Sequence, residues 1–308
     1  MRRLAVVGLL CALSVGVGAC GDDDDDSTTS SDTTEVTSGA ETADEAAADD
    51  AAADEADAGM CAPDAMELTT AGKLTIGTDS PAFEPWFVDD DPTNGKGFES
   101  AVAYAVAEEL GFSADQVEWK VVPFNSSYAP GEKDFDFDIN QISITEERAQ
   151  VVDFSEGYYE AAQAVITVEG SKIASAKTLA ELKDAKLGAQ VGTTSLEAIQ
   201  EGIAPTTEPA VFDDTAAAGA ALANGQIDGL VADLPTALYL AAAEIDGGVV
   251  LGQFEVPGLD NEQFGMLFEK GSTLVECVDA ALGQLRSSGD LAAIQKEWLG
   301  DAVAPTLG

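Results

Sequence analysis

The stretch 187–233, LGAQVGTTSLEAIQEGIAPTTEPAVFDDTAAAGAALANGQIDGLVAD, alternates short apolar runs with segments that favour helix. The apolar runs and the helical periodicity predict strands at 187–191, 210–212 and 229–232, and helices at 195–200 and 214–224. Strands that alternate with helices are typical of an α/β fold with mostly parallel sheets, because each helix returns the chain across the sheet.

The same alternation continues on both sides of this stretch. Further strands are predicted at 73–77, 117–122, 135–139, 161–168, 249–253 and 265–268, and further helices at 100–110, 179–182, 234–243, 274–287 and 291–299. Residues 61–308 (308 − 60 = 248 residues) favour two lobes over a single one.

Acidic side chains dominate the composition. The chain has 57 acidic and 14 basic residues and no histidine, for a net charge of −43; residues 61–308 keep −30 of it, from 42 acids and 12 bases. Such a surface repels a phosphate backbone, so nucleic-acid binding is not expected. The lack of histidine excludes Ser-His-Asp and Cys-His nucleophiles and His-ligated metals. The charge favours cationic or zwitterionic ligands, although solubility or a salty milieu explains it equally well.

The N-terminus is typical of an exported lipoprotein. Arg2 and Arg3 precede an apolar run, 4–17, that is too short to span a bilayer, so residues 1–19 are predicted to be a signal peptide. Ala19-Cys20 resembles the bacterial lipobox, which implies that Cys20 carries the lipid. The alternative is an ordinary cleavage site with a chance cysteine.

Residues 21–60 contain 15 acids and no base, and apart from alanine their only apolar side chains are one Val and one Met. Too little apolar surface is present to offset chain entropy, so 20–60 is predicted to be a lipidated cysteine followed by a disordered tether. As a coil it would reach roughly 35 Å. An interaction tail is the alternative interpretation.

The remaining cysteines suggest a disulfide. Cys11 leaves with the predicted signal peptide and Cys20 takes the lipid, which leaves Cys61 and Cys277 at opposite ends of the exported domain. Exported domains favour disulfides, so this pair is expected to be bonded. Two buried free thiols are the alternative.

Six motifs occur in a recognisable order: Thr78-Asp79, Gly97-Phe98-Glu99, Ser143 to Arg148, Val152 to Tyr159, Gly192-Thr193-Thr194 and Gln226 to Asp233. Together, over roughly 70–300, they resemble the polar amino-acid family (family 3) of bacterial extracellular solute-binding proteins, the receptor subunits of ABC importers.

The resemblance implies a two-lobe α/β fold of the periplasmic-binding-protein type II, with the ligand in the cleft between the lobes. The crossovers that join the lobes are expected near Tyr159–Ala164 and Phe254–Leu259. The solute-binding domain would then be 61–308, with lobe I at about 66–161 and 258–308 and lobe II at about 164–254.

An α-amino acid needs one partner for its carboxylate and one for its ammonium, because burying either unpaired is costly. The resemblance assigns the carboxylate to Arg148, whose planar fork suits it, and implies help from Ser143, Thr145, Thr193 and Thr194. It assigns the ammonium to Asp233. The alternatives are a surface ion pair of Arg148 with Glu146 or Glu147, a helix cap at Thr194, and a helix cap at Asp233.

The ligand's side chain is expected to meet Phe83 and Phe124 as stacking rings, with Trp86 in reserve, although each ring could instead be core. The segment 79–86 is one residue longer than the family's pattern before its aromatic residue, and Pro130 and Gly131 shorten or break a helix after Phe124. Asp79, Asn140 and Gln141 complete the expected pocket, and Gln141 stands where a small hydroxyl residue is usual.

These features imply a receptor that binds a free, polar amino acid and delivers it to an ABC permease, anchored to the outer face of the cell membrane by its lipid. A monomer is expected, without cofactor, metal or enzymatic activity. Two alternatives stay open. One is a solute-sensing lipoprotein, and the other is an exported enzyme like cyclohexadienyl dehydratase or the lytic transglycosylases, with Glu84 or Asp79 as its acid or base.

Overall fold

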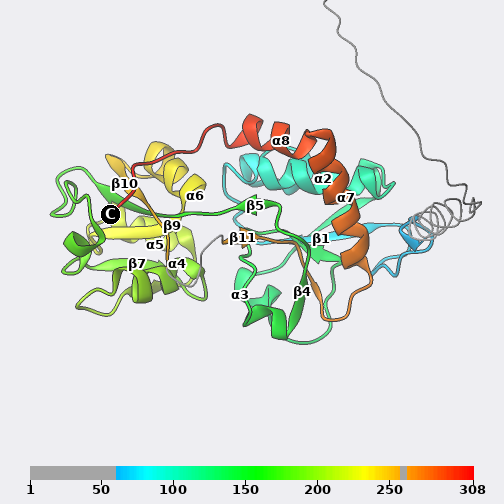
Figure 1. Cartoon of the computed structure of the whole chain (residues 1–308), viewed down its shortest axis with the longest axis horizontal. Coiled ribbons are helices and arrows are strands. Elements are labelled where there is room, and N and C mark those ends of the chain that lie inside the picture. Colours follow the sequence, from blue (N-terminus) through cyan, green and yellow to red (C-terminus); the bar gives the residue numbers. More distant parts are fainter. Residues whose placement is uncertain (1–59, 257–261) are drawn as a thin grey trace, which may run out of the picture. The chain divides into compact units, whose positions relative to one another are not determined.

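Residues 60–256 and 262–308 are described by the structure, a computed structural model. The predicted signal peptide 1–19, the lipidation site Cys20, nearly all of the tether and the end of the second crossover lie outside the described residues. The described part contains two five-stranded sheets, each flanked by helices (Figure 1). This confirms the predicted two-lobe α/β fold.

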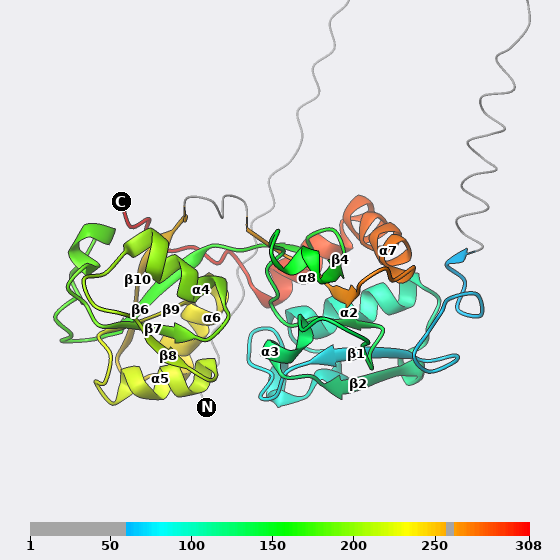
Figure 2. The ribbon, with the colours of Figure 1, turned by 90° about the horizontal axis from the view of Figure 1, so that it is seen from below.

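Lobe I is built on the sheet β2-β1-β3-β12-β4. Its elements are β1 (Leu74–Thr78), β2 (Val117–Val121), β3 (Phe137–Asp138), β4 (Val152–Phe154) and β12 (Leu267–Glu269), with helices α2 (Phe98–Glu109), α3 (Phe124–Ser127), α7 (Leu274–Ser288) and α8 (Asp290–Trp298). The four-residue α3 agrees with the helix-breaking effect expected of Pro130 and Gly131. Figure 2 shows β1 and β2 side by side beneath α2.

Alternation along the strands divides the residues of lobe I between two faces. Leu74 and Ile76 of β1 pack with Phe137 of β3 against α2 and α7. Gly77 faces the other way, toward Asp138, where a Cβ atom would lie 2.6 Å from a carboxylate oxygen. Only glycine therefore fits at this point of β1.

A disulfide joins Cys61 to Cys277 in α7, with Cα atoms 5.3 Å apart. The prediction of a bonded pair is confirmed. The bond ties the first described residues of the chain to a late helix of lobe I.

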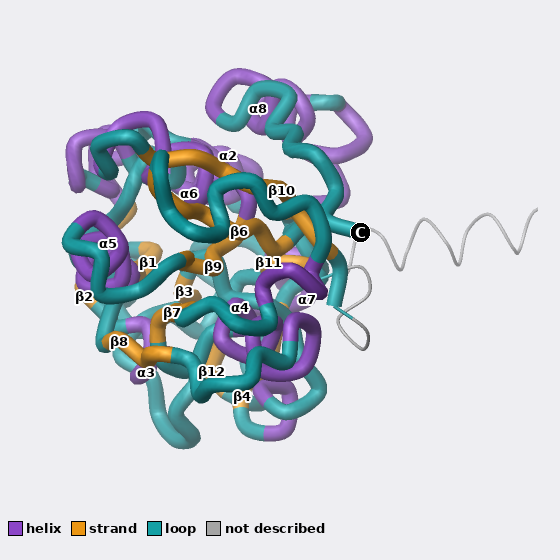
Figure 3. Tube along the Cα trace, turned by 90° about the vertical axis from the view of Figure 1, so that its left-hand side faces the viewer, coloured by secondary structure: helices purple, strands orange, loops and turns teal. Residues whose placement is uncertain are grey.

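Lobe II is built on the sheet β10-β6-β9-β7-β8. Its strands are β6 (Gln163–Val168), β7 (Leu187–Gln190), β8 (Ala210–Phe212), β9 (Gly229–Asp233) and β10 (Gly248–Phe254). Its helices are α4 (Thr194–Glu197) continued by the π-helical η6 (Ala198–Ile203), α5 (Thr215–Ala223), and α6 (Leu234–Tyr239) continued by the π-helical η7 (Leu240–Glu244). Helix α4 lies on one face of this sheet and α5 and α6 lie on the other (Figure 3). The buried side chains of η6 belong to one apolar cluster, and those of α5 and α6 belong to another.

Strand direction differs from the expectation. In the two large sheets β1–β2, β1–β3, β7–β8 and β7–β9 are parallel, whereas β12–β3, β12–β4, β6–β9 and β6–β10 are antiparallel. The prediction of mostly parallel sheets is therefore wrong. The cause is the crossovers, because β6 and β12 each enter their sheet directly after the chain has passed between lobes.

The crossovers pair with each other. β5 (Tyr159–Glu160) runs antiparallel to β11 (Gln263–Phe264). The other short elements are the 3₁₀ turns η1 (Val88–Asp90), η2 (Pro92–Asn94), η3 (Ala114–Gln116), η4 (Arg148–Gln150) and η5 (Leu179–Leu182).

The C-terminal segment after α8 runs onto lobe II (Figure 1). Leu307 is buried in the core of lobe II, and its N–H donates to the Gln253 carbonyl at 2.9 Å. The Leu179 N–H donates to the Gly308 carbonyl at 3.2 Å. We expected all of 258–308 to lie in lobe I. The end of this segment lies instead on lobe II, because its last apolar side chain, Leu307, is buried there.

Candidate ligand-binding site

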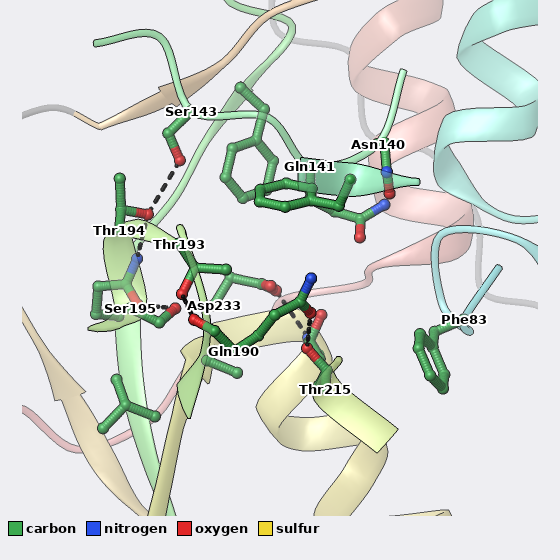
Figure 4. A pocket seen from close by; sticks show the side chains of 16 residues that line it. Phe83, Asn140, Gln141, Ser143, Gln190, Thr193, Thr194, Ser195, Thr215 and Asp233 are labelled. Carbon is green, nitrogen blue, oxygen red and sulfur yellow. Dashed lines mark hydrogen bonds between the residues drawn. The ribbon is translucent and has the colours of Figure 1, made fainter. Parts of the chain in front are cut away.

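A pocket opens where both lobes and a crossover meet. Its lining is rich in hydroxyl and amide groups: Phe83, Phe124, Asn140, Gln141, Ser143, Gln163, Gln190, Thr193, Thr194, Ser195, Thr215, Val231, Ala232, Asp233, Thr236 and Phe264. Figure 4 shows how these side chains converge from the ends of strands and the starts of helices. The pocket brings together most of the residues that the sequence predicts for ligand binding.

The turn from β7 into α4 forms part of the lobe II wall. Thr193 caps α4, because its hydroxyl accepts from the Leu196 N–H at 3.2 Å and donates to the Gln190 carbonyl at 2.8 Å. The cap of this helix is thus Thr193, one residue before the alternative weighed for Thr194. Thr194 is left with its side chain turned to the pocket.

Asp233 ends β9 and caps α6, and one of its oxygens accepts from the Thr236 N–H at 2.9 Å. Burial raises the pKa of Asp233 to about 6, and the charge of Glu262 raises it further. Among the described lining residues it is the only ionisable one. The helix-cap alternative is therefore present in the structure, but one capping bond uses only part of a carboxylate's capacity to accept.

Arg148 lies directly behind this pocket and is not among its lining residues. It is only 8% exposed, and its guanidinium donates to the Ser143 carbonyl at 2.7 Å and to the Gly192 carbonyl at 2.8 Å. The described ion pairs include none between Arg148 and Glu146 or Glu147. Arg148 is thus a buried cation that touches both lobes.

Aromatic rings cover the guanidinium. Its central carbon lies 5.0 Å from the centroid of the Tyr128 ring and 5.7 Å from that of Phe124. Burial lowers the pKa of Arg148, and the charges of nearby acidic groups, Glu262 among them, raise it. Phe124 therefore serves both the pocket lining and the packing of Arg148.

Glu262, which sequence reasoning missed, connects both lobes behind the pocket. One of its oxygens accepts from the Ser143 and Thr194 hydroxyls, each at 2.6 Å. The other accepts from the Gln163 amide at 2.9 Å. In the sequence, only its position close after the predicted second crossover indicates that Glu262 could lie near the ligand site.

The lobe I wall is held by a buried acid. Gln141 has a left-handed backbone (φ 48°), and its N–H donates to Glu99 at 2.7 Å while its side-chain amide donates to the same carboxylate. The Tyr158 hydroxyl also donates to Glu99. Burial raises the pKa of Glu99 to about 7, against the lowering effect of these hydrogen bonds. Next to Gln141, the Asn140 side-chain N–H₂ is buried without a protein partner.

Besides Arg148, three predicted site residues do not line the pocket. Trp86 is fully buried, packs edge-on against Phe98, Tyr159 and Phe264, and is core, as the alternative held. These aromatic neighbours enclose its ring, and its indole N–H donates to the Thr236 hydroxyl of lobe II at 2.8 Å, so it does not line the pocket.

Asp79 and Thr145 support the backbone. Asp79 accepts from the Ser80 and Phe124 N–H groups at 2.7 and 3.1 Å. The Thr145 hydroxyl accepts from the Arg148 N–H at 3.2 Å. Neither is a lining residue, because both side chains are already committed to local backbone groups.

Several lining residues were not predicted: Gln163, Gln190, Ser195, Thr215, Thr236 and Phe264. Gln190 accepts from the Thr215 hydroxyl at 2.8 Å, which joins two segments far apart in the sequence. Their placement at strand ends and helix starts was the available signal, since parallel strand ends gather at one edge of a sheet.

No cluster of three or more metal-ligating side chains occurs within 60–256 and 262–308. In the same residues no helix has the length and apolar character needed to cross a membrane.

Residues 74–301 match the family described as bacterial extracellular solute-binding proteins, family 3. The chain is 32% identical to the ABC transporter glutamine-binding protein GlnH of Bacillus subtilis (strain 168), over 68% of this chain and 75% of that relative.

Solved structures agree. An ancestral arginine-binding protein bound to glutamine is 31% identical, with a TM-score of 0.64, over 75% of this chain and 100% of the other. The ancestral amino acid-binding protein AncCDT-1, a precursor of cyclohexadienyl dehydratase, is 30% identical, with a TM-score of 0.60, over 74% and 95%.

Proposed function

Because the chain belongs to family 3 of the bacterial extracellular solute-binding proteins, we propose that it is the receptor of an ABC importer for a free, polar amino acid. The observation that carries this proposal is the pocket between the lobes, with one carboxylate in its lining and a buried arginine behind it.

Asp233 would hold the ligand's ammonium. It is the single ionisable group of the described lining, and its raised pKa reflects a buried charge with too few partners. An ammonium would supply the missing positive charge and restore the ionised form.

Arg148 would hold the ligand's carboxylate. A guanidinium has five N–H groups, and two of the Arg148 contacts go to carbonyls, so others are left to donate. Ser143, Thr145, Thr193 and Thr194 stay predictions as helpers, and only Thr145 is removed from the pocket wall.

The ligand's side chain would be polar and uncharged. Asn140, Gln141 and Gln190 present amides to the pocket, and the described lining offers no cation and no second acid. An ionised side chain would be buried without a partner, which is costly, whereas an amide or hydroxyl would find both donors and acceptors.

Release and capture would follow from movement of the lobes about the crossovers. In the part of the chain that the structure describes, the side-chain contacts that join the lobes include Trp86 to Thr236, Ser143 to Thr194 and Arg148 to Gly192, and Glu262 bridges Ser143 and Thr194. Since each lobe supplies one of the two charges, only a closed cleft would satisfy both ends of the ligand, and the ligand would favour closure by that difference.

The cellular location of the receptor is also part of the proposal. We propose that residues 1–19 direct export, that Cys20 carries the lipid, and that the acidic segment up to residue 60 tethers a monomeric domain near its permease. The alternative enzyme needs a further acid or base in the cleft. Neither Glu84 nor Asp79 lines the pocket, so no observation favours it.

Titration calorimetry against the twenty amino acids tests the proposal. We expect one or a few polar amino acids to bind, and Arg148→Ala to weaken them by a hundredfold or more, because a charge-assisted partner is lost. Glu108→Gln, at an exposed position of α2, is the control and should leave binding unchanged. Binding of none of the twenty would contradict the proposal.

A further inference from the structure

Glu262 competes for groups that a ligand carboxylate would need. Its Oε1 atom lies 2.6 Å from the hydroxyl of Ser143 in lobe I and 2.6 Å from that of Thr194 in lobe II. Both hydroxyls line the pocket, whereas Glu262 lies behind them, 8% exposed. The carboxylate therefore contacts the two hydroxyls from outside this pocket, and Glu262 lines a separate cavity with Gln163 and Glu255.

A count of protons gives the consequence. Each hydroxyl has one proton to donate and two lone pairs with which to accept. A carboxylate only accepts, so both short contacts to Glu262 use the hydroxyl protons, and neither proton is left for the 3.1 Å contact between the Ser143 and Thr194 hydroxyls. The Gln163 amide contacts Glu262 at 2.9 Å and Thr194 at 3.4 Å, and it donates in both. Ser143 and Thr194 thus turn lone pairs, and no proton, toward the pocket.

We propose that Glu262 is a positioning residue of this site: it withholds the Ser143 and Thr194 protons, so that these hydroxyls do not donate to the ligand's carboxylate. The inference rests on the proposed function, because it concerns the amino acid expected in this pocket. The resemblance implies that Ser143 and Thr194 help to hold the ligand's carboxylate, and this inference excludes their hydroxyl protons from that role.

The charge of Glu262 acts in the same direction. It raises the pKa of both Arg148 and Asp233, the two residues proposed to hold the ligand's charges. A carboxylate behind the wall repels the ligand's carboxylate and neutralises part of the Arg148 charge. Affinity for the ligand is therefore lower than the arginine alone would give.

A double-mutant cycle on the full-length chain tests this. The dissociation constant of each of the twenty amino acids is measured by calorimetry for wild type, Ser143→Ala, Glu262→Gln and the double variant. Glu262→Gln keeps the shape, removes the charge and lets an amide donate to the hydroxyls, which frees their protons for the pocket. Glu255→Gln, on an exposed residue near the same crossover, is the control.

We expect Ser143→Ala alone to change the wild-type constant less than about threefold, since no proton reaches the ligand. Glu262→Gln should tighten binding about tenfold, equivalent to about 1.4 kcal/mol, and Ser143→Ala should then remove most of that gain. Glu255→Gln should have no effect. Glu262→Asp, which withdraws the carboxylate from the hydroxyls, should also tighten binding and serves if the glutamine variant does not fold.

Two results would overturn the inference while the proposed function stands. One is a tenfold or larger loss from Ser143→Ala in the wild type, and the other is unchanged or weaker binding in folded Glu262 variants. If wild type binds no amino acid, the proposed function fails and takes the inference with it.

Discussion

The two walls of the pocket differ in how they are held. In lobe I, Asn140 and Gln141 follow a short strand, and the buried acid Glu99 fixes the second of them. In lobe II, Thr193 and Asp233 are fixed as helix caps. The lobe I wall offers rings, two amides and the Ser143 hydroxyl, and the lobe II wall offers hydroxyls, the amides of Gln163 and Gln190, and the one carboxylate of the described lining. Amides on both walls are thus suited to a polar side chain, whereas only the lobe II wall is suited to an ammonium.

The lobes also differ in covalent support. Lobe I contains the Cys61–Cys277 disulfide, which closes a separation of 216 residues, whereas residues 163–254 contain no cysteine. Replacing both cysteines by serine should lower the free energy of unfolding by about 4 kcal/mol, because the unfolded chain regains loop entropy. Denaturant unfolding of the oxidised wild type and the variant measures it.

Ligand binding by the same variant is the control, since the pocket lies far from the bond in the sequence and should keep its affinity. If the free energy of unfolding fell by less than 1 kcal/mol, lobe I would be stable without its disulfide, and the two lobes would not differ in covalent support.

The next largest effect is expected from replacing Asp233, the carboxylate of the lobe II wall. Asp233→Asn should weaken amino-acid binding roughly a hundredfold, or about 3 kcal/mol, since a buried ammonium would lose its charged partner. Calorimetry measures the change, and Asp213→Asn, at an exposed position of lobe II, is the control. Loss of less than fivefold would place the ammonium elsewhere.

The pH dependence sharpens the same contrast. The pKa of Asp233 is about 6, above the ordinary value of 3.8, so the ligand-free site takes up a proton as the pH falls through 6. Since an ammonium prefers the ionised form, that proton must leave on binding, and affinity should be about tenfold weaker at pH 5 than at pH 8. Titrations at both pH values check this, and a pH-independent affinity in the wild type would contradict it.

The smallest effect belongs to the lobe I wall. Asn140 has a buried N–H₂ group without a protein partner, suited to an oxygen on the ligand's side chain. Asn140→Ala should weaken ligands with such an oxygen about fivefold, or roughly 1 kcal/mol, and leave alanine or glycine binding unchanged. Asn224→Ala, exposed at the end of α5, is the control. An equal loss for all amino acids would mean that the asparagine supports the wall without reading the side chain.

Much of the fold is predictable from the sequence because burial leaves a periodic trace. The strand at 210–212 and the helix at 274–287 are found within a residue or two of β8 and α7. Strand direction leaves no such trace, since a buried strand has the same pattern in either direction. The sequence therefore did not reveal that β6 runs antiparallel to β9, or β12 to β4.

The site is predictable where a motif fixes the backbone. Thr193, Thr194 and Asp233 stand at strand-to-helix turns, so their exposure to a cleft could be foreseen. The positions of Trp86 and Glu262 relative to the pocket could not be predicted in this way. An apolar ring can pack in a core or line a pocket, and a single glutamate beside a crossover gives no sign of the two hydroxyls that it contacts across the lobes.

A crystal structure of the chain with the amino acid that binds in calorimetry tests the central claim most directly. We expect the ligand between the lobes, its ammonium within about 3 Å of an Asp233 oxygen and its carboxylate within hydrogen-bonding distance of the Arg148 guanidinium. A ligand bound outside this pocket, or with its carboxylate at Ser143 and Thr194 and its ammonium away from Asp233, would contradict the account.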